Sequence, residues 1–189
     1  MDKTIKKHID EHVDVLKSLS DHTATIGQIA KILIHCLSDK GTIFWCGNGG
    51  SASDSQHLSG ELIGRFVDNR KSLRSIALSS GDAVGTCIAN DFGFVNIFSR
   101  QLEGLARPGD VLIGITTSGN SQNILNAFKA ANSLKVKTIG FLGKGGGKAL
   151  KYADVSIVIK SKTTARIQEM HILIGHILCD LIEEGLNLK

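Results

Sequence analysis

Apolar residues recur at helical spacing in two segments near the start of the chain. Residues 3–18 carry a loose apolar stripe, and residues 23–37 carry a second stripe. We expect Asp21 or Thr23 to cap the second helix and Gly41 to end it. The pattern therefore predicts two amphipathic helices ahead of the first strand.

After these helices, short apolar runs alternate with helical segments. Strands are expected at 42–46, 74–78, 111–116, 138–142 and 155–159, each apolar throughout and therefore buried on both faces. Helices are expected at 51–65, 82–88, 95–106, 121–134 and 164–185. Alternating strands and helices form right-handed crossovers, so the pattern predicts a single α/β sandwich with about five parallel strands.

Composition and charge narrow the class of protein. The 189 residues suit one domain, 1–189. The formal charge of +4 is spread along the chain without an arginine-rich run, so no nucleic-acid partner is expected. No apolar run approaches the ~18 residues of a membrane span, and the first residues are polar. We therefore expect no membrane association, no secretory leader and a cytoplasmic location.

The cysteines are Cys36, Cys46, Cys87 and Cys179. They form no C-x-x-C pair, and most lie among apolar residues. Buried reduced thiols are therefore expected.

Two loops of small polar residues each connect a predicted strand to a predicted helix. Residues 47–53 read GNGGSAS and residues 116–121 read TTSGNS. Because the carboxyl ends of parallel strands share one edge of a sheet, both loops should lie at that edge. Helix N-termini attract anions and hydroxyls add donors, so the pair favours a phosphate monoester. A tight turn with an N-cap serine is the alternative for either loop alone.

Known nucleotide-binding patterns are missing or incomplete in these loops. Neither contains G-x-x-x-x-G-K-[ST]. Gly47-Asn48-Gly49 begins the dinucleotide pattern G-x-G-x-x-G, but Ala52 stands in place of its third glycine. No acidic residue ends a second strand about 20 residues later, so a dinucleotide site is disfavoured.

Histidines and acids on two predicted helices are candidates for metal binding or acid–base chemistry. His57 and Glu61 are four residues apart and share one helix face, where they suit either role or form a plain surface pair. Gln168 and His176 are eight apart, roughly 80° around the last helix and about 12 Å along it. A histidine within ILIGHILCDLI is more often a satisfied core residue than a ligand. Spacing alone thus argues only weakly for a metal site there.

Five segments together resemble a known enzyme family. They are GNGGSASDSQH, ELIGRF, ANDFGF, ITTSGNSQNIL and ARIQEMHILIGHILCDLIE, and they look like the sedoheptulose 7-phosphate (phosphoheptose) isomerases of the sugar isomerase (SIS) superfamily. The resemblance covers nearly the whole chain. It implies a three-layer SIS-type domain with a central five-stranded parallel sheet, and N-terminal helices within 1–40 that pack in an oligomer.

The resemblance also implies an activity and partners. Such enzymes interconvert sedoheptulose 7-phosphate and D-glycero-D-manno-heptose 7-phosphate, the first step towards ADP- or GDP-heptose for bacterial lipopolysaccharide or capsule. They are typically homotetramers with active sites at subunit interfaces, and many carry zinc.

Residue roles follow from the same resemblance. One zinc per subunit would be held by His57, Glu61, Gln168 and His176. The phosphosugar would contact Asn48, Gly49, Gly50, Ser51, Glu61, Asn90, Asp91, Thr116, Thr117, Ser118, Ser121 and Gln168. Thr116 stands where the family commonly has serine and keeps the hydroxyl. Ala165 stands where some members have aspartate, so that role is vacant or moved here.

Aldose–ketose isomerisation through a cis-enediol(ate) needs a base and an acid. Glu61 is the expected base and His176 the expected acid, with Asp91 orienting sugar hydroxyls or assisting a proton relay. Glu61 and His176 cannot both bind zinc tightly and move protons freely. Two alternatives stay open: an SIS isomerase for another sugar phosphate, and a non-catalytic regulator resembling the DnaA initiator-associating protein, which lacks the full acid and histidine set.

Overall fold

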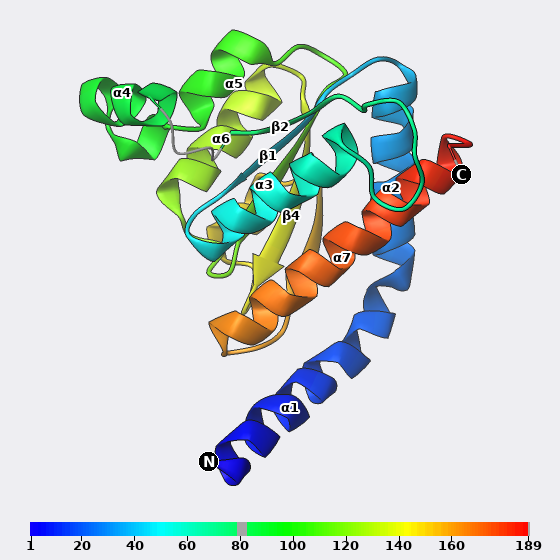
Figure 1. The fold of residues 1–189 in the computed structure, drawn as a ribbon. Helices are drawn as coiled ribbons and strands as arrows, with labels where there is room; N and C mark the ends of the chain where they lie inside the picture. Colours follow the sequence, from blue (N-terminus) through cyan, green and yellow to red (C-terminus); the bar gives the residue numbers. More distant parts are fainter. Residues whose placement is uncertain (79–82, 189) are drawn as a thin grey trace.

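The central element is a parallel five-stranded sheet in the order β2-β1-β3-β4-β5 (Figure 1). The computed structural model describes residues 1–78 and 83–188. The strands are β1 (Ile43–Gly47), β2 (Ser75–Ala77), β3 (Val111–Thr116), β4 (Lys137–Gly143) and β5 (Val155–Ile159). Ile43 of β1 is aligned with Val111 of β3, so β1 and β3 end side by side. The predicted five-stranded parallel sheet is confirmed.

Helices cover both faces of the sheet, which makes three layers (Figure 1). One face is covered by α2 (Thr23–Ser38), α3 (Gly50–Ile63) and α7 (Thr164–Gly185). The other is covered by α5 (Ser99–Leu105) and α6 (Gln122–Ser133). The remaining helices are α1 (Asp2–Lys17), α4 (Ala83–Phe92) and the 3-10 turns η1 (Ser18–His22), η2 (Phe94–Asn96) and η3 (Gly147–Lys151). None of the described helices is both long and apolar enough to span a bilayer.

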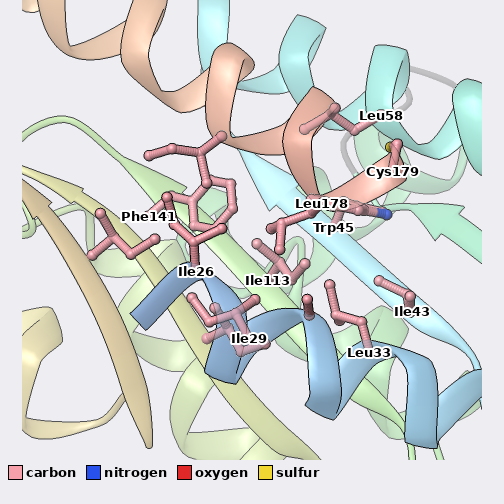
Figure 2. Close-up of a cluster of buried hydrophobic side chains, with 14 of the residues drawn as sticks. Ile26, Ile29, Leu33, Ile43, Trp45, Leu58, Ile113, Phe141, Leu178 and Cys179 are labelled. Carbon is pink, nitrogen blue, oxygen red and sulfur yellow. The ribbon is translucent and has the colours of Figure 1, made fainter. Parts of the chain in front are cut away.

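The two hydrophobic cores follow from the alternation of side chains along each strand. Ile43 and Trp45 of β1 point to the α2/α3/α7 layer, whereas Phe44 and Cys46 point to the α5/α6 layer. Figure 2 shows the first core, where side chains from α2 and α7 meet those of the sheet. A strand between two helical layers must be apolar on both sides, as β1 and β3 are.

Several local predictions are corrected. The residue before α2 is His22, and no side chain caps the helix, because the Thr23 hydroxyl donates to the Ser20 carbonyl of the preceding turn. Lys40, rather than Gly41, adopts the left-handed conformation after α2, with a φ of 62°.

Other differences lie around the edge of the sheet. Within the described part of the chain, β2 is an edge strand that pairs with β1, and it is not buried on both faces, since Ile76 is exposed. The helix expected at 95–106 is broken into η2 and α5. The helix expected from Asp82 is α4, which begins at Ala83, and Asp82 lies outside the described residues.

The cysteines are free thiols, and three of them are buried. Burial raises the pKa of Cys36 and of Cys179 to about 12, and it also raises the pKa of Cys46. Cys87 on α4 is exposed, so the expectation of burial is wrong for this residue.

Candidate functional site

The two small-residue loops meet at the carboxyl edge of the sheet, as predicted. Asn48 in the first loop and Asn123 at the start of α6 exchange two side-chain hydrogen bonds of 2.9 and 2.8 Å. The loops line a cavity of about 320 Å³ together with Thr164 and Gln168 of α7. Its loop residues are Asn48, Gly49, Gly50, Ser51, Thr116, Thr117 and Ser121. The cavity is thus walled by small residues, hydroxyls and amides.

The local structure of these loops suits an anionic group. Gly49 has a φ of 56°, which glycine adopts without strain, and α3 begins at the next residue. The N-terminus of α3 carries partial positive charge at the cavity wall. In the second loop, the Thr116 hydroxyl lies 3.1 Å from that of Ser121 and 3.4 Å from that of Ser118. The hydroxyls are held close together, where they can donate jointly to phosphate oxygens.

A second cluster forms farther along α3, where it meets α7. His57 Nε2 lies 3.2 Å from Glu61 Oε1 and 3.4 Å from His176 Nε2. One potential ligand atom from each of these residues lies within 4.8 Å of the others. Two imidazole nitrogens and a carboxylate oxygen are donors that zinc accepts, so this group fits a divalent metal.

The close approach of α3 and α7 brings this cluster together. Gly175 has no side chain, and a Cβ at that position would lie 2.4 Å from Cδ1 of Leu58. Leu58 follows His57, and His176 follows Gly175, so this tight crossing places the two imidazoles beside each other. The interpretation of His176 as a satisfied core histidine is therefore wrong.

The core histidine of α7 is His171 instead. It is fully buried, with Nε2 3.1 Å from the Leu142 carbonyl oxygen and Nδ1 without a partner among the described residues. Burial lowers the pKa of His171 to about 4, with the Leu142 contact opposing the shift. This residue stays neutral near pH 7 and belongs to the core.

The other residues singled out in the sequence lie on α7 and α4. Gln168 lies in the loop cavity, close enough to Gly50 that a Cβ there would be 2.4 Å from its Nε2. Asn90 and Asp91 are exposed on α4, joined by a 2.7 Å hydrogen bond, and line neither this cavity nor the one between the first loop and α4. Ala165 is exposed at the start of α7.

Three further residues belong to the site: Asp54, Phe66 and Asn123. Phe66 stacks on His176, with ring centroids 5.5 Å apart and planes inclined by 23°. Burial raises the pKa of Asp54, a shift that His57 opposes. Asp54 stands three residues before His57, a spacing that places both on one helix face. Phe66 and Asn123 carry no such signal, because their partners lie far away in the sequence.

Comparison with known proteins gives a consistent result. The sequence profile described as a SIS domain matches residues 7–143. The phosphoheptose isomerase of Sulfurimonas denitrificans is 45% identical over 188 residues, covering 97% of this chain and 96% of that protein. The chain belongs to the phosphoheptose isomerases of the SIS domain family. The phosphoheptose isomerase of Nitratiruptor is 49% identical over 186 residues, covering 93% of this chain and 98% of that protein.

A solved structure supports the same membership. The phosphoheptose isomerase from Neisseria gonorrhoeae superposes with a TM-score of 0.92 at 37% identity, covering 97% of this chain and 98% of that one. The fold of this phosphoheptose isomerase is therefore of the SIS type. None of these relatives supports the regulatory alternative.

Proposed function

We propose that this phosphoheptose isomerase interconverts sedoheptulose 7-phosphate and D-glycero-D-manno-heptose 7-phosphate, the first step towards activated heptose for surface glycans. One observation carries the proposal: a cavity suited to phosphate and a His/Glu cluster both lie along α3, at its start and farther along. Such an arrangement suits a substrate with phosphate at one end and a reacting carbonyl at the other.

The phosphosugar is bound by the two loops in this proposal. Ser51, Ser118 and Ser121 donate to the phosphate together with Thr116 and Thr117. Asn48, Gly49, Gly50 and Gln168 complete the contacts around the sugar. Asn90 and Asp91 of α4 supply contacts to the sugar hydroxyls. Because these two residues line neither cavity, this last assignment rests on the family resemblance.

Glu61 and His176 perform the proton transfers. The Glu61 carboxylate removes the proton from the carbon next to the carbonyl, and protonated His176 gives a proton to the carbonyl oxygen. Glu61 then returns its proton to the former carbonyl carbon, while the hydroxyl on the other enediol carbon gives its proton back to His176, which yields the isomer and restores both groups. His57 lies between the two groups, in contact with both, and so helps to hold them at the substrate.

The metal of the proposal is zinc, one per subunit, held by His57, Glu61 and His176 with Gln168 as a fourth ligand. Zinc bound there would supply Lewis-acid polarisation of the sugar carbonyl. Glu61 and His176 would then have two roles, holding the ion and moving protons.

The molecule is proposed to be one SIS domain, 1–189, that assembles as a homotetramer in the cytoplasm. In α1 no residue is buried within the chain, and its stripe of Ile5, Ile9, Val13 and Leu16 is exposed. Exposed apolar stripes of this kind typically cover a partner surface. In this proposal, helices within 1–40 form the contacts between subunits, and the active sites lie at those contacts.

Turnover of sedoheptulose 7-phosphate tests the proposal, with NMR detection of the aldoheptose phosphate. The protein is assayed after metal stripping and after zinc is restored. We expect zinc to restore turnover, and Glu61→Gln to lower kcat by at least about 100-fold, as loss of a general base does, while the sugar phosphate still binds.

Glu103→Gln is the matched control, because it makes the same change at an exposed carboxylate on α5. It should leave kcat unchanged. Turnover by Glu61→Gln equal to wild type would refute the base assignment. Turnover indifferent to zinc would refute the metal role but keep the isomerase.

A further inference from the structure

A buried ion pair between Arg70 and Glu183 joins the segment that follows α3 to α7. Arg70 Nε donates to Glu183 Oε1 at 2.8 Å, and the two side chains are only 2% and 0% exposed. The same carboxylate accepts backbone N–H bonds from Phe66 at 3.1 Å and Val67 at 3.2 Å. Burial alone would raise the pKa of Glu183, but these bonds outweigh it and lower the pKa. Glu183 is therefore held as a carboxylate.

Arg70 also satisfies the end of the helix that carries Glu61. Its Nη2 donates to the Glu61 carbonyl oxygen at 2.8 Å, and its Nη1 donates to the Leu62 carbonyl oxygen at 2.8 Å. The last carbonyls of a helix have no partner within the helix. The planar guanidinium supplies several donors in fixed directions, which a lysine does not. Arg70 thus fixes the backbone of Glu61 relative to α7.

Glu183 acts in the same way on the His176 side of the Glu61–His176 pair. It binds the amide of Phe66, whose ring lies nearly parallel to that of His176. His176 and Glu183 are both on α7, seven residues apart and therefore on similar faces of the helix. The backbone of Phe66, from which its ring reaches His176, is therefore held by a contact from the helix that carries His176.

We propose that Arg70 and Glu183 are positioning residues for the Glu61–His176 pair. They fix the segment 64–70 so that Glu61 keeps its place at the end of α3 and Phe66 keeps the His176 ring in one orientation. The expected effect on turnover rests on the proposed function of Glu61 and His176. The expected effect on the orientation of the His176 ring does not.

Buried ion pairs are often replaceable by apolar residues with little effect on folding, whereas removal of one partner strands a charge. The test variant is therefore the double replacement Arg70→Met/Glu183→Met in the full-length protein. Its control is Arg100→Met/Glu103→Met, the same chemical change at a half-exposed pair on α5.

Two readouts separate positioning from folding. The Cε1–H signal of His176, assigned by its absence in His176→Asn, reports the Phe66 ring current. Steady-state kinetics with sedoheptulose 7-phosphate report kcat and KM. We expect the double variant to unfold cooperatively, to shift the His176 signal towards its position in Phe66→Leu, and to lower kcat roughly 10- to 100-fold with little change in KM. The control pair should match wild type in both readouts.

A His176 signal at the wild-type position in the folded double variant would overturn the proposal, as would an unchanged kcat. If wild type does not turn over the sugar phosphate, the proposed function fails, and the NMR signal alone decides whether the pair positions His176. If the double variant does not fold, Arg70→Lys replaces it as the test variant. Lysine keeps the positive charge but lacks the several fixed donors of the guanidinium. A partial shift of the His176 signal is then expected, and none would overturn the proposal.

Discussion

Gly50 shows how the absence of one side chain shapes the loop cavity. It lies at the first position of α3, and a Cβ there would lie 2.4 Å from Nε2 of Gln168. The Nε2 atom is the end of the flexible Gln168 side chain, so an added Cβ would displace this side chain rather than unfold the helix. The glycine therefore serves the cavity more than the stability of the fold.

At this scale we expect Gly50→Ala to weaken substrate binding without unfolding the protein. The displaced Gln168 amide no longer reaches the cavity, so KM should rise several-fold, consistent with the loss of one hydrogen bond of about 1 kcal/mol. Steady-state kinetics and thermal unfolding measure the two effects.

Gly60→Ala is the control within the same helix, because a Cβ there meets nothing within 4 Å. It should leave KM unchanged and stabilise the protein by up to about 1 kcal/mol through helix propensity. An unchanged KM in Gly50→Ala would show that Gln168 does not contact the substrate.

Residue types could be recognised in the sequence, but their surroundings could not. Spacing brought out His57 and Glu61, because both lie on one helix and four residues apart is a geometric constraint. It failed for His176, because an apolar flanking sequence does not reveal that a neighbouring helix exposes a histidine there. Arg70 and Glu183 escaped notice because they are 113 positions apart and neither lies in a motif.

The crossing of α3 and α7 is the element-scale feature on which the His/Glu cluster depends. Gly175 contacts Leu58 at this crossing, and Leu58 is fully buried. With glycine at 175, the two helices approach closely enough for His57 and His176 to come within 3.4 Å. A larger residue must push Leu58 or the whole of α3 away.

We therefore expect Gly175→Ala to impair both stability and turnover. Overpacking costs about 1–3 kcal/mol, and alanine returns about 1 kcal/mol of helix propensity. The net loss should be up to about 2 kcal/mol in urea unfolding, with kcat reduced because His176 moves relative to Glu61.

Gly60→Ala again provides the comparison, since it adds the same methyl group to α3 without a neighbour. If Gly175→Ala proved as stable and as active as Gly60→Ala, the crossing would not determine the geometry of the cluster.

Most elements could be predicted at this scale. β3, β5 and α7 begin and end at the residues that the apolar pattern indicates, because each is long or apolar enough to be unambiguous. β2 forms where it was predicted, but its expected burial on both faces was wrong, because Ile76 is exposed at the edge of the sheet. The helix predicted at 95–106 was wrong in its continuity, since it is divided into η2 and α5.

At the scale of the whole molecule, no residue of α1 is buried. Figure 1 shows α1 extending past the body of the domain, and His12 Nδ1 of α1 is 2.7 Å from Glu169 Oε2 of α7. Ile5 and Ile9 are 58% and 57% exposed. Two exposed isoleucines one turn apart on a helix favour contact with another subunit.

Accordingly, wild type should have about four times the 20.2 kDa mass of the chain in light scattering coupled to size exclusion. Ile5→Glu/Ile9→Glu should shift it to smaller species, because charges do not pack in an apolar interface. Turnover should fall along with assembly if the active sites lie between subunits.

Lys3→Glu/Lys7→Glu is the control, as it adds two carboxylates on the same helix at exposed charged positions. It should keep the mass of wild type. A wild-type protein with the mass of one chain would refute the tetramer.

The sequence by itself determined the α/β architecture, the two small-residue loops and the resemblance to the family, because periodicity and motifs are local properties. Only the tertiary structure decided that His176 lies beside His57 and that His171 is the buried histidine. It also decided that a buried Arg70–Glu183 pair supports Glu61 and Phe66. These features arise where α3, α7 and the segment between α3 and β2 pack together, and packing joins residues that no local pattern connects.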